Sequence, residues 1–168
     1  MGRVFRHALA VLVFPVTVVV IVPTWIAESS STDLGLPQSV LAWVLFGFGI
    51  VVLMGGAVLF VSSLKRFGTE GDGTLAPWDP PKGLVVRGPY AYVRNPMISG
   101  VFLLLVSEAL LLRSPSHLAW AAVFALINAI YIPLLEEPRL KARFGDEFEE
   151  YARHVPRVIP RLEPWRRS

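Results

Sequence analysis

The sequence contains no cysteine and only three histidines among its 168 residues. The absence of cysteine excludes disulfide bonds, thiolate metal ligands and a cysteine nucleophile within this chain. His7, His117 and His154 lie far apart without a second ligand at helical spacing, so no metal site is expected. Charge is also scarce, since Asp, Glu, Lys and Arg make up 17% of the residues whereas 54% are hydrophobic. A soluble domain of this size needs more surface charge, so the composition indicates a membrane protein.

The hydrophobic residues gather in four runs that carry almost no charge, at about 8–27, 37–64, 97–112 and 118–135. Crossing the hydrocarbon core of a bilayer takes roughly 20 apolar residues, and only the third run is slightly short of this length. A cleaved signal peptide is the alternative for the first run, but that run is long and no Ala-x-Ala-like site follows it. The runs therefore predict an all-α polytopic membrane protein with four transmembrane helices, forming a single domain over residues 1–168.

The positive charges are unevenly distributed between the predicted loops. Arg3 and Arg6 precede the first run, the 28–36 loop has only acidic charges, and the 65–96 loop and the residues after 135 are rich in Lys and Arg. By the positive-inside rule, both termini are cytoplasmic. The basic charge then indicates contact with anionic lipid headgroups, and no nucleic acid partner is expected. Arginine outnumbers lysine thirteen to three, which is typical of a GC-rich bacterial genome, so the bacterial inner membrane is the expected location.

Glycine and proline mark two further features. The segment 68–83 is rich in both and predicts an irregular connecting loop. Glycines of the second run predict close helix packing without forming the GxGxxG motif, which excludes a Rossmann nucleotide site. These glycines are Gly47, Gly49, Gly55 and Gly56.

The segment 138–154 has the pattern of an amphipathic helix. Four apolar residues spaced four, four and three apart share one face, with charged residues on the rest. They are Leu140, Phe144, Phe148 and Tyr151. The pattern predicts a single C-terminal helix lying on the membrane interface.

Two polar clusters flank the last two hydrophobic runs. Tyr90, Tyr92, Arg94 and Asn95 precede the third run, and the pair Glu136-Glu137 follows the fourth. Because the two runs form a tight helical hairpin, both clusters are expected at the same cytoplasmic boundary. Acids beside arginines and tyrosines are typical of a pocket for a zwitterionic, partly aromatic ligand. Structural ion pairing, snorkelling to the interface and matching of the helix dipole are alternative explanations for the same residues.

Glu108 is an isolated charge inside the third run. It is expected to face a packed polar partner, and lining a substrate path is the alternative.

The sequence RGPYAYVRNPMISG at 87–100, followed by EEPRLKARFGDEFEEYARHVPRVIP at 136–160, resembles a known superfamily. It is that of the integral-membrane isoprenylcysteine carboxyl methyltransferases and phospholipid N-methyltransferases. The ordered combination of motifs covers about 82–160. The resemblance implies an S-adenosylmethionine (SAM) cofactor held outside any Rossmann fold.

The resemblance also implies roles for individual residues. Backbone contacts to SAM would come from Lys82, Gly83, Leu84 and Val85. The cofactor would be lined by Tyr90, Asn95, Pro96, Met97 and Ile98. Glu136 and Glu137 would lie near its charged end, where carboxylates favour an ammonium group and aromatic faces tolerate a sulfonium. Arg94 would orient an anionic acceptor or pair with Glu136, and a glutamate would accept a proton from the acceptor.

Two positions depart from the isoprenylcysteine branch of the superfamily. Asn95 stands where that branch has histidine, and Ile132 stands where it has an arginine for the substrate carboxylate. Both differences argue against carboxyl methylation of a prenylcysteine. The predicted function is therefore SAM-dependent methyl transfer to a lipidic or small apolar acceptor that enters from the bilayer. A nicotinamide-dependent reductase of a sterol-like lipid and a non-enzymatic membrane scaffold are the alternatives, and SAM binding separates them from a methyltransferase.

Overall fold

The computed structural model describes residues 12–30, 32, 35–70 and 83–166, and within these ranges every regular element is helical. In chain order the elements are η1 (Leu12–Ile21, π-helical), α2 (Val22–Ser29), α3 (Val40–Glu70), η2 (Gly88–Ala91, a 3₁₀ turn), α4 (Pro96–Leu111), α5 (Pro115–Tyr131), η3 (Ile132–Glu136, π-helical), α6 (Glu137–Phe144) and α7 (Asp146–His154). The all-α prediction is confirmed for the described part of the chain.

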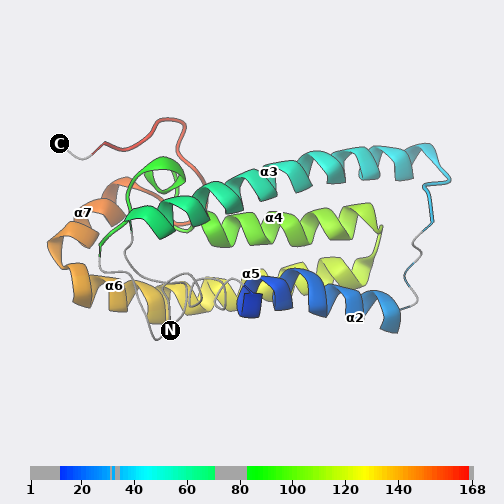
Figure 1. The fold of residues 1–168 in the computed structure, drawn as a ribbon, viewed down its shortest axis with the longest axis horizontal. Coiled ribbons are helices and arrows are strands. Elements are labelled where there is room, and N and C mark those ends of the chain that lie inside the picture. The colour runs from blue at the N-terminus through cyan, green and yellow to red at the C-terminus, as the bar shows by residue number, and fades with distance from the viewer. Residues whose placement is uncertain (1–11, 31, 33–34, 71–82, 167–168) are drawn as a thin grey trace.

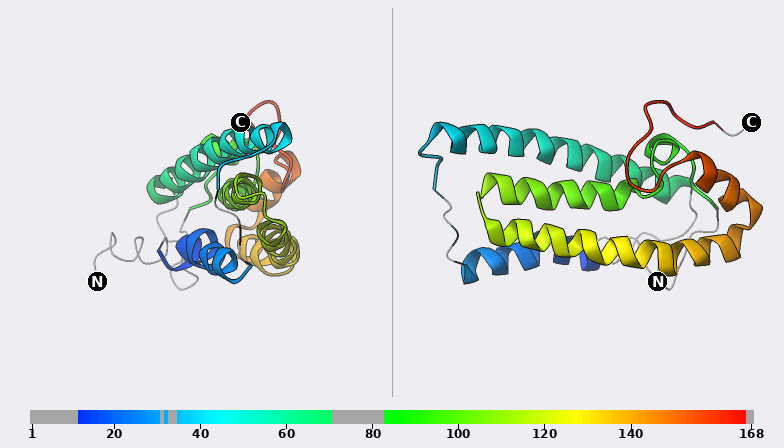
Figure 2. Two further views of the ribbon diagram at one scale, coloured as in Figure 1. Left: turned by 90° about the vertical axis from the view of Figure 1, so that its right-hand side faces the viewer. Right: turned by 180° about the vertical axis from the view of Figure 1, so that it is seen from behind.

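The long helices lie side by side along one axis of the molecule. Figures 1 and 2 show α3 beside α4, α5 returning antiparallel to α4, and the N-terminal helix alongside α5. α5, η3 and α6 follow one another without a break, so a continuous helical rod extends from 115 to 144. The short elements η2, α6 and α7 gather at one end of the bundle, where both polar clusters lie.

Two of the helical segments are long and apolar enough to cross a membrane. They are Val40–Glu70 and Pro115–Phe144, and two shorter apolar helices cover Phe14–Ser29 and Pro96–Leu111. A helix of 16 residues, such as α4, is about 24 Å long, less than the roughly 30 Å of the hydrocarbon core. These helices support a membrane protein, and the arrangement with four complete spans stays a prediction.

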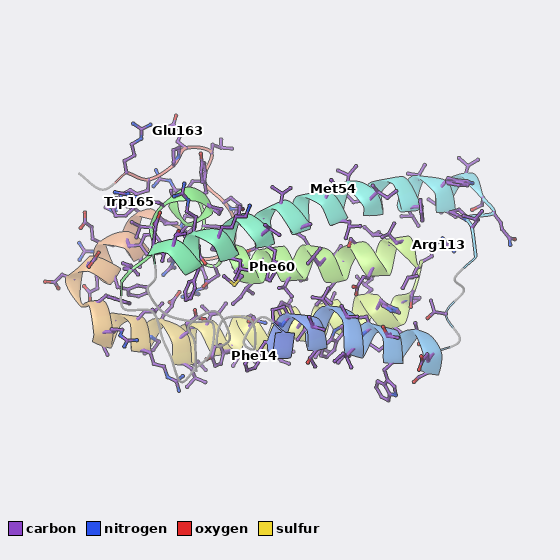
Figure 3. The ribbon with its side chains drawn as sticks, in the orientation of Figure 1. Phe14, Met54, Phe60, Arg113, Glu163 and Trp165 are labelled. Atoms are coloured by element: carbon purple, nitrogen blue, oxygen red, sulfur yellow. The ribbon has the colours of Figure 1, made fainter. Side chains whose placement is uncertain are left out.

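The outer side of α3 is apolar and exposed. Val51, Met54 and Val58 each have 60% or more of their surface accessible, and Figure 3 shows Met54 pointing away from the bundle. An exposed apolar patch of this extent is unusual on a soluble protein and suits contact with lipid chains.

Glycines allow α3 and α4 to approach closely. A Cβ at Gly100 would lie 2.8 Å from the backbone nitrogen of Phe60, and a Cβ at Gly56 would lie 3.0 Å from the neighbouring helix. Gly49 is similarly crowded by the end of α4. The predicted close packing is thus confirmed at Gly49 and Gly56, while Gly47 and Gly55 face open space.

Buried polar side chains join α5 to the N-terminal helix. His117 is 1% exposed, with Nδ1 2.8 Å from Ser114 Oγ and Nε2 3.1 Å from the carbonyl of Pro23. Trp120 Nε1 donates to the carbonyl of Val18 at 3.1 Å. These contacts give His117 a packing role.

The prediction of a single helix over 138–154 was wrong. The helix breaks at Gly145, whose φ of +52° lies in the left-handed region that favours glycine, and the chain restarts as α7. The apolar face folds inward, because Phe148, Tyr151 and Val155 form a buried cluster packed on Leu84 and neighbouring side chains. This face contacts the protein rather than the membrane.

The predicted loop over 68–83 begins later than expected, because α3 continues through Glu70. Residues 71–82 of that loop, including Lys82, lie outside the described residues.

Candidate functional site

The chain turns sharply just before α4. Pro89 begins a 3₁₀ turn, and Gly88 has a φ of +60°, with Arg66 of α3 so close that a Cβ would lie 3.1 Å from its side chain. Four residues in and around this turn are buried, namely Val85, Tyr90, Ala91 and Val93. The chain therefore enters α4 through an irregular, non-α-helical turn.

The C-terminal tail after α7 pairs with the backbone of this turn. Arg94 N donates to the carbonyl of Pro156 at 2.9 Å, and Arg161 N donates to the carbonyl of Tyr92 at 3.0 Å. Trp165 N donates to the carbonyl of Ala91 at 2.9 Å. Three backbone hydrogen bonds thus fix residues 91–94 against a segment 62 to 74 positions later in the sequence.

Glu137 is held by two arginines. Arg94 Nη1 lies 3.0 Å from Glu137 Oε1. Arg157 donates from Nε to Oε1 at 2.8 Å and from Nη2 to Oε2 at 2.7 Å, a bidentate pair. The hydrogen bond to Glu137 raises the pKa of Arg157. The prediction that Arg94 pairs with Glu136 was wrong, since its partner is Glu137.

Glu136 has a different environment from its neighbour. It is half-buried at the end of η3, and among the described residues it has no cationic partner. Burial, followed by the charges of Tyr151 and Glu136, raises the pKa of the Tyr90 phenol above its ordinary value. The structure brings both polar clusters together, as the sequence predicts.

The remaining sequence-predicted residues lie at the same end of the bundle. Asn95 precedes α4 without capping it through its side chain. Pro96 and Val85 are buried, whereas the other positions are half-buried, namely Gly83, Leu84, Met97 and Ile98. Their roles toward a cofactor stay predictions, and Lys82 lies outside the described residues.

A recess of about 340 Å³ opens beside the Arg94–Glu137 pair. Its lining residues are Arg94, Glu137, Lys141, Phe148, Glu149, Ala152 and Arg153. Arg94 Nε is buried, and among the residues that the structure describes it has no hydrogen-bond partner. Charges of both signs and one buried aromatic ring suit a zwitterionic ligand, and the unpaired Nε could donate to an anionic group.

Glu108 and Ile132, both noted in the sequence, are not part of the cluster around Glu137. Glu108 Oε2 is buried and no hydrogen-bond partner for it is found within the described ranges, so the expected polar partner is missing there. Ile132 is 5% exposed and packs in the interior. In the part of the chain that the structure describes, no group of three His, Cys, Asp or Glu side chains could hold a metal ion.

The fold and the charged cluster describe a helical membrane protein with a recess beside the Arg94–Glu137 pair at one end of its bundle. Residues 38–147 match the phospholipid methyltransferase family, and the chain belongs to it.

Curated relatives support the same superfamily. The chain is 35% identical over 82 residues to methanethiol S-methyltransferase 2 of Bradyrhizobium diazoefficiens, covering 47% of this chain and 29% of the relative. It is 30% identical over 120 residues to protein-S-isoprenylcysteine O-methyltransferase B of Arabidopsis thaliana, covering 70% and 60%. It is 39% identical over 74 residues to methanethiol S-methyltransferase of Crocosphaera subtropica, covering 42% and 27%. The chain thus spans less than two thirds of each relative's length.

Proposed function

We propose that this chain is an integral-membrane enzyme that transfers the methyl group of SAM to a lipidic or small apolar acceptor at the cytoplasmic membrane boundary. Membership of the phospholipid methyltransferase family supports methyl transfer. Two of the relatives are named for methanethiol and one for isoprenylcysteine, a small apolar thiol and a lipidated residue. These names favour a methyltransferase over the reductase and the scaffold as the chain's function.

The observation that carries the proposal is the contrast between the two adjacent glutamates. Glu137 is neutralised by Arg94 and Arg157, whereas Glu136 is half-buried without a cationic partner among the described residues. A carboxylate withdrawn from water is costly unless a counter-charge approaches it. SAM carries two such cations, an ammonium and a sulfonium. Glu136 is therefore the residue that we expect to receive the cofactor's positive charge.

The residues around the recess fit the rest of the cofactor's amino-acid end. Arg94 Nε is buried, has no hydrogen-bond partner in the described part of the chain, and can donate to a carboxylate. Glu137 anchors the other side of the same guanidinium at 3.0 Å and so fixes its direction. Lys82, Gly83, Leu84 and Val85 would contact the cofactor through their backbone, and Asn95, Pro96, Met97 and Ile98 would line it with Tyr90.

SAM would supply a methyl group already activated on a sulfonium, so few acid–base groups are required of the protein. The chain's own contribution would be to align the acceptor and to keep water away from it. Tyr90 and its buried neighbours provide the dry wall, and Arg94 would orient an anionic acceptor. If the acceptor is an amine or a thiol, Glu136 would accept the proton that it loses.

SAM binding by the purified chain in mild detergent tests the proposal. Mass spectrometry should find SAM co-purified with the protein, and calorimetry should measure its affinity. Glu136→Gln should weaken SAM binding about tenfold or more, because charge-assisted contacts contribute about 1.5–3 kcal/mol. The matched control is Glu163→Gln, at an exposed carboxylate of the tail, which should bind SAM like the parent.

Two results would overturn the proposal. One is a folded parent protein that binds a nicotinamide nucleotide and not SAM. The other is a folded Glu136→Gln variant whose SAM affinity equals that of the control, which would leave Glu136 without a role at the cofactor.

A further inference from the structure

The C-terminal tail displays large apolar side chains to its surroundings. Val158 is 68% exposed, Ile159 is 78% exposed and Leu162 is fully exposed, at 100%. Trp165 of the same tail is tucked inward instead, with its ring centroid 5.8 Å from that of Tyr151. The tail therefore has an inner side that packs on α7 and an outer side that is apolar and uncovered.

This outer side belongs to a fixed segment of backbone. Arg161 N and Trp165 N donate to carbonyls of the turn before α4, at 3.0 Å and 2.9 Å. Arg161 Nη1 also donates to the carbonyl of His154 at 2.8 Å. Because the hydrogen bonds occur on both sides of Leu162, the apolar residues are held outward by the fold.

The tail lies at the same end of the molecule as the charged C-terminal turns of α3 (Figure 1). α3 has 31 residues and is about 46 Å long, so its last turns extend beyond a hydrocarbon core of roughly 30 Å. The charged residues Lys65 and Arg66 lie in these turns, and Arg66 contacts Gly88 of the segment that the tail pairs with. The tail is bonded to a turn that packs on Arg66, so a bilayer crossed by α3 would have the tail at headgroup depth.

The tail also lies on the side of the bundle that faces lipid. Figures 1 and 2 show it extending past the outer side of the C-terminal part of α3, the helix whose exposed face is apolar. Figure 3 shows Glu163 at the outer edge of this overhang, with Trp165 nearer to α7. A segment that overhangs a lipid-facing helix at headgroup depth lies above the surrounding bilayer surface.

The 155–166 tail carries more basic than acidic residues, since Arg157, Arg161 and Arg166 stand against Glu163. Lys65 near the end of α3 and Arg87 just before η2 are further exposed cations. Basic residues beside exposed apolar side chains at a membrane boundary attract anionic headgroups.

We propose that Val158, Ile159 and Leu162 insert into the interfacial layer of the bilayer around α3, and that the neighbouring cations bind anionic lipid headgroups. The tail, and not the apolar face of residues 138–154, is then the interfacial contact of this end of the protein. The inference goes beyond methyl transfer and holds whether or not the chain binds SAM.

Single-cysteine labelling tests the contact directly, because the chain has no cysteine of its own. Ile159→Cys and Leu162→Cys would each carry an environment-sensitive fluorophore in the full chain reconstituted into phosphatidylcholine–phosphatidylserine vesicles. Val51→Cys on the exposed face of α3 gives the lipid-contact reference, and Asp146→Cys at the corner between α6 and α7 gives the aqueous control. Quenching by lipids with a nitroxide near the headgroup should be several-fold stronger at 159 and 162 than at 146.

Three results would contradict the proposal or its headgroup part. Quenching at 159 and 162 no stronger than at 146 overturns the insertion. Labels shielded from both the lipid nitroxide and aqueous iodide mean that protein covers the tail, either a second copy or another partner, and this also overturns the proposal. Vesicles without phosphatidylserine should give weaker quenching at 162. In Arg166→Gln, quenching at 162 should depend less on phosphatidylserine than in the parent. Quenching that is independent of phosphatidylserine overturns the headgroup part.

Discussion

The phenolic hydroxyl of Tyr151 donates a 2.7 Å hydrogen bond to the backbone carbonyl of Tyr90. Both residues are buried, with 3% and 9% of their surface exposed. The bond joins α7 to the turn before α4, and it satisfies a carbonyl that water cannot reach. The turn that carries Arg94 is therefore held partly by α7, which lies about sixty positions later in the sequence.

Tyr151→Phe should destabilise the protein while leaving its shape intact. The variant leaves the Tyr90 carbonyl without a donor, which costs about 1–3 kcal/mol for a buried group. Thermal unfolding in detergent measures the loss. Tyr131→Phe, at a side chain that is 38% exposed, is the control and should unfold like the parent. Equal unfolding temperatures for both variants would mean that the hydrogen bond contributes nothing.

Stability should fall at alkaline pH through the same two residues. Burial raises the pKa of Tyr90 and of Tyr151 above the ordinary value of about 10. A raised pKa in the folded state means that this contribution to stability is complete below pH of about 10 and is lost as the pH rises further. Unfolding curves measured up to pH 11 should show a steeper decline for the parent than for Tyr90→Phe or Tyr151→Phe. Parallel curves would contradict the prediction.

Gly100→Ala should disrupt the contact between α3 and α4. The new methyl group would meet the backbone nitrogen of Phe60 at 2.8 Å, where the backbone must move to make room. Overpacking of this kind costs about 1–3 kcal/mol. Gly55→Ala, which meets nothing within 4 Å, is the matched control and should be neutral or slightly stabilising. A thermal unfolding scan distinguishes the two, and equal effects would show that the helices are not closely packed.

The bidentate pair between Arg157 and Glu137 should show as an energetic coupling. Because the Arg157 side chain is 39% exposed, water screens the pair and a coupling of about 1 kcal/mol is expected. A double-mutant cycle with Arg157→Gln and Glu137→Gln, read by unfolding in detergent, measures it. Arg139→Gln, at an exposed position on α6, replaces Arg157→Gln in the control cycle and should show no coupling.

The four-span topology predicts that the two ends of the bundle face opposite compartments. Gln38→Cys precedes α3 and Asp146→Cys begins α7, and both positions are exposed. In oriented membrane vesicles, an impermeant thiol reagent should label one of them from outside and the other only after permeabilisation. Labelling of both from the same side would exclude the four-span arrangement.

Helix positions could be predicted from hydropathy, because the backbone inside a bilayer must satisfy its own hydrogen bonds. The run 97–112 corresponds to α4 almost residue for residue. The break at Gly145 could not be predicted in this way, since an isolated glycine is compatible with a helical pattern. Its positive φ lets α7 fold back onto the cluster around Phe148, and that tertiary contact has no local signal in the sequence.

The helical hairpin predicts that the two polar clusters lie at the same end of the bundle. It does not predict which glutamate forms the ion pair with Arg94. Successive residues of a helix point about 100° apart, so Glu136 and Glu137 cannot share one environment. Which of them faces Arg94 depends on the rotation of the rod from 115 to 144, which packing decides. Arg157 was missed because twenty positions separate it from Glu137 and no spacing rule relates them.

The pairing of residues 91–94 with residues 156–165 also bears on how the protein is made. During synthesis the turn before α4 leaves the ribosome well before its hydrogen-bonding partners exist, and α4 and α5 enter the membrane in the interval. The wall of the site can form only after the tail has been translated, so the order of events is insertion first and site assembly second. Release of a chain stopped before Trp165 should therefore leave the helices in place around an unfinished site.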